Sequence, residues 1–310
     1  MKTKVKKVVN KKSVFRRIRS GWEFYLFVLP LVVYLVLFRY IPMAGIVVAF
    51  EDFSITKGVF GSEWVGFKWF ERFFNSFYFE TVLVNTLTIT SLSLLLTFPI
   101  PILLALLLDE APRKLKKVVQ TVTFAPHFIS TVVLCGMVLI FLSPSSGVVN
   151  HLIAALGGER INFMQESNLF KWVYVLSDIW QEMGWNSIIF VAALSNVDGQ
   201  QLEAACIDGA SRLQRVLYVK VPTILPTIVT LLILKCGSIM SLGQDKILLL
   251  QNDTNIEASE VIATYVYKTG LISQNYSMST AVGLFNSVVN IIMLLIVNKI
   301  SKKLSETSLW

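Results

Sequence analysis

Residues 201–226, QLEAACIDGASRLQRVLYVKVPTILP, are the stretch that decides the fold. They are the longest polar, charge-bearing interval with helical order inside an otherwise apolar chain. Two short helices are predicted to meet at Gly209, because glycine adopts positive φ at little cost. Asp208 or Ser211 can cap the second helix, and Pro222 suits the first turn of a membrane helix that follows. Small residues on the first helix leave a surface that another protein can approach closely.

The composition is that of an integral membrane protein. The chain has 310 residues, of which 54% are hydrophobic and 15% charged, and its mean hydropathy is +0.64. A soluble domain rarely combines so many apolar residues with so few charges. The net charge of +8 is concentrated in tails and loops, which points to membrane orientation and anionic lipid and not to nucleic acid. Neither the spacing of Cys135, Cys206 and Cys236 nor that of His127 and His151 suggests a disulfide or a metal site.

Six apolar runs are long enough to cross a bilayer as helices. They are residues 23–49, 81–108, 119–142, 170–194, 222–242 and 280–300. The sequence therefore predicts an all-α membrane domain over 23–300, between a basic tail (1–22) and a short C-terminal tail (301–310). Prolines in the first and second runs predict bends. Residues 51–79 are rich in aromatic side chains, and they form either a helix at the outer interface or a loop packed on the spans.

The basic residues predict the orientation. Six spans place both termini on one side, together with the loop after the second run and the loop 195–221. Most lysines and arginines lie on that side, so the positive-inside rule makes it cytoplasmic. A signal peptide is the alternative for the N-terminal tail, but no cleavage site of small residues follows it and the next apolar run is too long, so we expect a cytoplasmic tail that fixes the orientation.

The opening stretch resembles the EAA loop of bacterial ABC (ATP-binding cassette) importer permeases. The family pattern is Glu-Ala-Ala, then Asp-Gly-Ala, then Ile-x-Leu-Pro, and the last part is here the conservative variant Val-Lys-Val-Pro. The residues that match and that the resemblance implies in ATPase coupling are Glu203, Ala204, Ala205, Asp208, Gly209, Ala210 and Pro222. The alternative is an ordinary amphipathic connector between two spans.

Further matches extend the resemblance over most of the chain. Residues 38–43, 142–163, 179–189, 260–270 and 281–285 are similar to the LplB-like subfamily of oligosaccharide and polysaccharide-fragment permeases. The resemblance implies the MetI/MalF-G-like fold of type I importers, in the bacterial plasma membrane. It implies as partners a second homologous permease, two ATP-binding subunits and an extracellular solute-binding lipoprotein. ATP and Mg would be bound by the partner subunits, because the sequence has no Walker A loop and no enzyme motif.

Polar side chains inside the apolar runs are the candidates for a substrate pathway, since charge in hydrocarbon is costly. Glu182 and Lys235 lie at similar depth, so a pair between them is geometrically reasonable. Such a pair is either structural, or Lys235 is a cavity charge that meets a saccharide, an acidic one included. The tryptophans among these candidates either pack against neighbouring helices or stack on the apolar faces of a sugar. The asparagines of the last run share a helical face and either line the cavity or bond a neighbouring helix. The candidates are Asp178, Trp180, Gln181, Glu182, Trp185, Asn186, Lys235, Asn286 and Asn290.

The sequence therefore predicts the permease subunit of an oligosaccharide importer. An ion-coupled secondary transporter for a small polar solute is one alternative, compatible with the carboxylates of the fourth run, but it leaves the loop 195–221 without a role. A membrane enzyme acting on lipid-linked sugars is another. That enzyme would need carboxylates or histidines clustered at one membrane face, and the sequence shows no such cluster.

Overall fold

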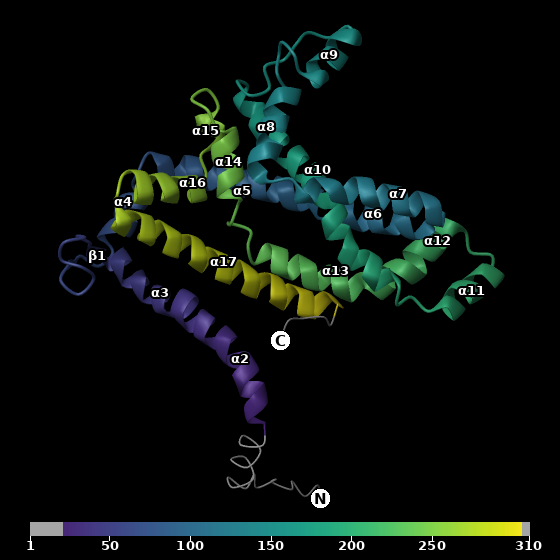
Figure 1. Cartoon of the computed structure of the whole chain (residues 1–310), viewed down its shortest axis with the longest axis horizontal. Coiled ribbons are helices and arrows are strands. Elements are labelled where there is room, and N and C mark those ends of the chain that lie inside the picture. The colour runs from purple at the N-terminus through teal and green to yellow at the C-terminus, as the bar shows by residue number, and fades with distance from the viewer. Residues whose placement is uncertain (1–20, 306–310) are drawn as a thin grey trace, which may run out of the picture.

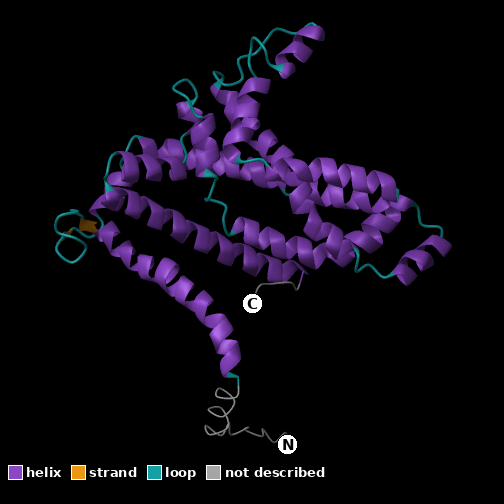
Figure 2. Cartoon of the chain, viewed as in Figure 1, coloured by secondary structure: helices purple, strands orange, loops and turns teal. Residues whose placement is uncertain are grey.

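The computed structural model describes residues 21–305, most of which are helical (Figures 1 and 2). The α-helices are α2 (Trp22–Leu35), α3 (Ile41–Met43), α4 (Lys68–Phe74), α5 (Tyr78–Thr97), α6 (Pro99–Glu110), α7 (Arg113–Phe124), α8 (Thr131–Phe141), α9 (Val148–Ala155), α10 (Ser167–Leu194), α11 (Gly199–Ile207), α12 (Arg212–Arg215), α13 (Val221–Cys236), α14 (Gln244–Leu250), α15 (Ile256–Ser259), α16 (Ile262–Tyr267) and α17 (Tyr276–Ser305). Strands β1 (Glu51–Asp52) and β2 (Glu63–Trp64) pair antiparallel, with Glu51 opposite Trp64. Helical turns of 3-10 or π type join several of these helices.

Four continuous helices are long and apolar enough to cross a membrane: Trp22–Phe50, Tyr78–Glu110, Arg212–Cys236 and Tyr276–Lys303. A fifth is present if the bent pair Arg113–Phe128 and Thr131–Phe141 is one span. Helix α10 covers the predicted fourth run with 28 residues, but with its charged and polar side chains it is not among these four. The all-α architecture is confirmed, and the count of six spans with cytoplasmic termini stays a prediction.

The predicted third span, 119–142, is not one straight helix. Its two halves meet at an angle of 106°. The first half ends in a 3-10 turn, Ala125–Phe128, that contains Pro126. A new helix then begins at Ser130, whose hydroxyl accepts a hydrogen bond from the Val133 N–H at 3.4 Å. Proline removes a backbone donor and serine supplies a new N-cap, so the chain changes direction here.

The helix that contains the predicted fifth span does not start at Pro222. The helix begins ten residues earlier, at Arg212, and runs without a break to Cys236, so it ends before the predicted position 242. A π-helical turn, Val216–Lys220, comes directly before Pro222, and the Val221 N–H bonds the Val216 carbonyl. The wider turn accommodates the proline, which would otherwise clash with the preceding turn of an α-helix.

The segment between the first two spans contains a hairpin and a short helix that packs on the spans. The first helix continues through its π-helical and 3-10 turns to Phe50, and the hairpin β1–β2 follows. Helix α4 has only seven residues, and Trp69 and Phe73 on it are buried. The ring of Phe73 contacts Phe79, Tyr265 and Phe285, so α4 is fixed to α5, α16 and α17.

Helix α10 runs through the middle of the molecule, where it packs against α5, α6 and α13 (Figure 1). Helices α11 and α12 lie at one end of the bundle, while α8, α9, α14 and α15 protrude from it. Residues 244–279, between the fifth and sixth predicted runs, pack on the bundle, because Ile247, Leu250 and Ile262 among them are fully buried. A separate apolar cluster joins α6, α10 and α13 near the loop 195–221.

Candidate functional site

The loop 195–221 folds as two helices around a glycine turn, as its sequence predicts. Gly209 has φ +79°, and the Ala210 N–H bonds the Ala205 carbonyl at 2.9 Å. Of the two predicted caps, Ser211 starts the second helix. Its N–H bonds the Gln214 side chain at 2.7 Å, and its hydroxyl accepts from the Gln214 N–H at 3.4 Å.

The first helix of this loop is open to its surroundings. No residue of α11 is buried, and Ile207 at its end is 86% exposed. Glu203 and Ala204 are exposed, and a hollow of about 250 Å³ between α11 and the following helix is lined by Ala205, Asp208, Gly209 and Ala210, among others. Pro222 is the exception among the motif residues, since it lies inside the long helix that follows and not at the turn.

A polar cavity of about 310 Å³ lies where α5, α10 and the end of α13 meet the non-helical residues 237–243. Four of the predicted pathway residues are brought together here: Asp178, Gln181, Glu182 and Lys235. Thr90 and Ser93 of α5 add hydroxyl groups, and Lys246 of α14 adds a second ammonium.

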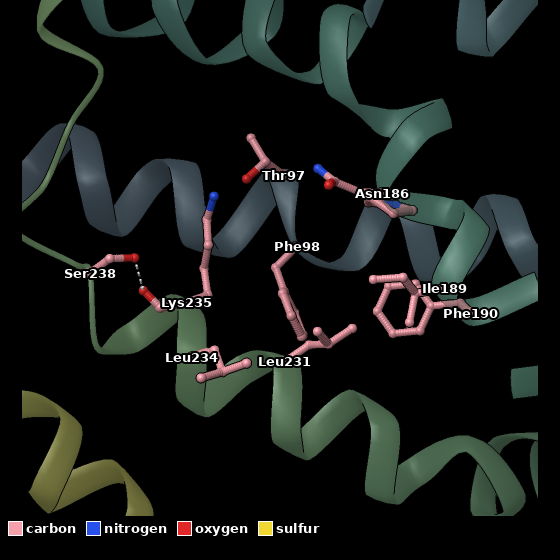
Figure 3. A pocket seen from close by; sticks show the side chains of 10 residues that line it. Thr97, Phe98, Asn186, Ile189, Phe190, Leu231, Leu234, Lys235 and Ser238 are labelled. Atoms are coloured by element: carbon pink, nitrogen blue, oxygen red, sulfur yellow. Dashed lines mark hydrogen bonds between the residues drawn. The ribbon is translucent and has the colours of Figure 1, made fainter. Parts of the chain in front are cut away.

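A second cavity, of about 300 Å³, is mainly apolar (Figure 3). Phe98, Ile189, Leu231 and other apolar side chains line it, together with the predicted Asn186. Lys235 and Ser238 line both cavities. Figure 3 shows the Lys235 ammonium extending toward Thr97, with Asn186 across from it. Lys235 therefore marks the boundary between an apolar and a polar space.

The structure does not pair Glu182 with Lys235, although the sequence makes that pair geometrically reasonable. The Glu182 carboxylate lies 3.1 Å from Nδ1 of His127, which the bend between α7 and α8 brings against α10. Asp178 pairs instead with Lys246, at 3.4 Å. Within residues 21–305 the Lys235 ammonium has neither an ion pair nor a hydrogen bond.

Sequence reasoning missed both new partners. The spacing of His127 along the sequence does not indicate its contact with Glu182, and Lys246 lies outside the six apolar runs. Burial lowers the pKa of the Lys246 ammonium, while the neighbouring Asp178 opposes that shift. A single lysine before the apolar run ILLL was the available signal that Lys246 is buried.

The remaining candidates are divided between packing and exposure. Trp180 packs on an apolar cluster, whereas Trp185 is 43% exposed and its ring stacks on His127 at 4.3 Å. Asn290 bonds a neighbouring segment, since its Oδ1 accepts the Met240 N–H at 2.9 Å. Asn286 has a buried Oδ1 without a hydrogen-bond partner. Neither asparagine lines the two cavities.

The comparison with known families agrees with the resemblance of this chain to importer permeases. Residues 97–306 match the family "Binding-protein-dependent transport system inner membrane component". The chain belongs to this family. As its members do, this permease resides in the bacterial membrane.

The similar proteins include transporters that are named for saccharides. The permease is 43% identical to the polygalacturonan/rhamnogalacturonan transport system permease protein YteP of Bacillus subtilis (strain 168), over 98% of this chain and 95% of that protein. It is 42% identical to Protein LplB of the same organism, over 94% and 92%. A chain of a bacterial ABC transporter involved in the import of the acidic polysaccharide alginate superposes with a TM-score of 0.88 and 38% identity, covering 94% of this chain and 99% of that one. A second structure of a bacterial alginate ABC transporter, in complex with an alginate pentasaccharide-bound periplasmic protein, matches equally well.

The protein is therefore the permease component of a sugar ABC importer, and it is a transport subunit and not an enzyme. The fold, the loop 195–221 and the relatives agree on this. Both alternatives, the ion-coupled transporter and the membrane enzyme, are set aside.

Proposed function

We propose that this permease is one of two different permease subunits, and that it works with two ATP-binding subunits and an extracellular solute-binding lipoprotein. In this assembly the loop 195–221 lies in the cytoplasm, with both termini, and receives the movement of an ATP-binding subunit. ATP and Mg are bound by those partners. The site on this chain is the surface of α11 with the turn at Gly209.

The observation that carries the proposal is the continuous helix Arg212–Cys236. It begins two residues after the loop's turn, and Lys235, near its other end, lines both cavities. At 1.5 Å per residue these ends are roughly 35 Å apart. A rigid rod of this kind moves the cavity wall whenever the loop moves.

The surface of α11 supports contact with a partner. Its alanines allow a close approach, and its exposed Ile207 and Glu203 supply apolar and charged contacts. A helix with no buried residue gains little stability from this chain alone, because most helical stability in proteins comes from packing. Seating in a groove of the partner provides that packing.

We propose further that the cargo is an oligosaccharide that carries carboxylates. Lys235 supplies a cation without a partner inside residues 21–305, at the boundary of an apolar cavity. A pyranose ring presents apolar faces that suit Phe98 and Ile189, and hydroxyls that suit Asn186 and Thr97. The names of the relatives point the same way, since polygalacturonan, rhamnogalacturonan and alginate all contain uronic acids.

Co-purification and transport test this proposal. The tagged permease, expressed with the second permease and ATP-binding subunit encoded beside it, is expected to bring down both. In proteoliposomes, the binding protein loaded with a galacturonate oligomer is expected to stimulate ATP hydrolysis and import, whereas a neutral oligomer of equal length is not. Failure to recover an ATP-binding subunit would overturn the coupling role. Equal import of both oligomers would overturn the assignment of an acidic cargo.

A further inference from the structure

Lys220 is the only residue of the loop 195–221, all of which the structure describes, that is buried. Its ammonium lies 2.5 Å from Oδ2 of Asp109, and it also pairs with the carboxylate of Glu110. Asp109 and Glu110 are the last two residues of α6, where the second span ends. One lysine thus joins the base of the loop to the end of another span.

The apolar surroundings make this contact strong and directional. Ala105 and Leu106 of α6 pack with Phe190 and Leu194 of α10 and with Ile224 of α13. The Lys220 side chain is 8% exposed, whereas its two acidic partners are 27% and 33% exposed. Removing one partner of such a pair leaves a charge without compensation, which is far more costly than losing a surface ion pair.

The backbone at Lys220 is specialised as well. Lys220 is the last residue of the π-helical turn Val216–Lys220. A π-helical turn contains one more residue than an α-turn, and each residue of an α-helix turns the chain by about 100°. The turn therefore changes the face on which the preceding part of the helix, with Arg212 and Arg215, lies relative to Lys220. Single turns of this type occur frequently at functional sites.

We propose that Lys220, Asp109 and Glu110 form a joint through which movement of the loop 195–221 reaches the second span. The helix Arg212–Cys236 carries one wall of the two cavities, and the second span carries another, with Thr90, Ser93, Thr97 and Phe98. The joint makes both walls move with the loop. Without it, a displaced loop tilts its own helix while the second span stays behind.

This inference rests on the proposed function, because it assumes that the loop receives the partner's movement. Lys220 is a positioning residue, and it acts through the two acids at the end of the second span. Loss of a joint and loss of a merely stabilising ion pair have different measurable effects. Loss of a stabilising pair lowers the amount or the thermal stability of the complex. Loss of a joint separates ATP hydrolysis from transport in a complex that is still assembled.

The test uses the full importer in proteoliposomes and compares Lys220→Met, Lys220→Arg and the double variant Asp109→Asn/Glu110→Gln. Lys114→Met is the matched control, because Lys114 is an exposed lysine at the start of α7 with no ion pair among the described residues. Three quantities are measured: basal ATP hydrolysis, its stimulation by the loaded binding protein, and the sugar imported per ATP. We expect Lys220→Met and the double variant to assemble and keep basal hydrolysis. Stimulation and import per ATP should fall at least about fivefold, the lower end of typical coupling factors.

Lys220→Arg and Lys114→Met should behave as the unmodified importer. The exchanged variant Lys220→Glu/Glu110→Lys, which restores a pair with the charges reversed, should recover most of the coupling lost in Lys220→Glu. Normal coupling in an assembled Lys220→Met importer would overturn the joint. If Lys220→Met does not fold, the triple variant Lys220→Met/Asp109→Asn/Glu110→Gln decides, because it removes the joint and leaves no charge without a partner.

A separate arm distinguishes this failure from failure of the proposed function. Gly209→Val changes the loop itself and leaves the joint intact. If Gly209→Val uncouples the importer while Lys220→Met and the double variant do not, only the joint is refuted. If Gly209→Val also couples normally, the loop does not receive the partner's movement, and both proposals fail.

Discussion

The turn at Gly209 offers the sharpest test of how the loop 195–221 is built. Its φ of +79° lies in the left-handed region, which costs a residue with a Cβ about 1–2 kcal/mol. A Cβ added at Gly209 would have no atom within 4 Å, so the cost is backbone strain and not a clash. A penalty of this size lowers the ratio of correct to incorrect turns about 5- to 30-fold. It matters here because α11 has no buried residue to hold it in place.

A series of variants separates strain from other effects. Gly209→Asn should be mild, since asparagine tolerates this region, Gly209→Ala should be intermediate, and Gly209→Val should be most severe, since a β-branched residue fits there least. The assay is ATP hydrolysis stimulated by the loaded binding protein in the assembled importer. Gly199→Ala, at a glycine of α11 with ordinary φ and open space, is the control and should couple normally. Equal coupling by the asparagine, alanine and valine variants would refute the reasoning.

Three further changes test the cavity and the packing around it. Lys235→Met should weaken import of an acidic oligomer roughly 10- to 100-fold, the worth of a hydrogen bond to a charged group, and leave a neutral oligomer unaffected. Gly184→Ala should lower the free energy of unfolding in detergent by about 1–3 kcal/mol or more, because its Cβ would lie 2.2 Å from the carbonyl oxygen of Thr123. Gly283→Ala is the control and should not lower it, because that position has open space. Asn290→Leu should lower the free energy of unfolding by about 1–3 kcal/mol, because it leaves the buried Met240 N–H unpaired. Asn286→Leu should be neutral or stabilising in the same melting assay, since the buried Asn286 oxygen has no partner to lose.

Local chemistry explains what could be predicted from the sequence. Gly209 and Ser211 act on their own neighbours, through backbone freedom and a cap, so the two-helix loop was predictable from a few residues. The apolar runs were predictable for a similar reason, since a bilayer demands length and apolarity whatever the neighbouring helices are. Pro222 shows the limit of such reasoning. A proline at the first turn of a helix is only a preference, and the π-helical turn before it lets the helix start at Arg212.

Contacts between distant segments could not be predicted from depth alone. Similar depth along their own runs makes a pair of Glu182 with Lys235 reasonable from the sequence. The bend at Pro126 turns the third run back onto α10 and places His127 beside Glu182. The non-helical residues 237–243 in turn carry Lys246 to Asp178. Both events depend on tertiary packing, which a count along each run does not contain.

The charge pattern of the cavity follows from these pairings. Both carboxylates of α10 have partners other than Lys235, since Asp178 contacts the Lys246 ammonium and Glu182 contacts Nδ1 of His127. Neither forms an ion pair with Lys235, and no other group within residues 21–305 does so. A charge at membrane depth without a partner is costly, so such residues face a cavity, a partner chain or a ligand. The position of Lys235 at the boundary of both cavities favours a ligand that carries a carboxylate. A neutral sugar would leave the Lys235 charge without a partner.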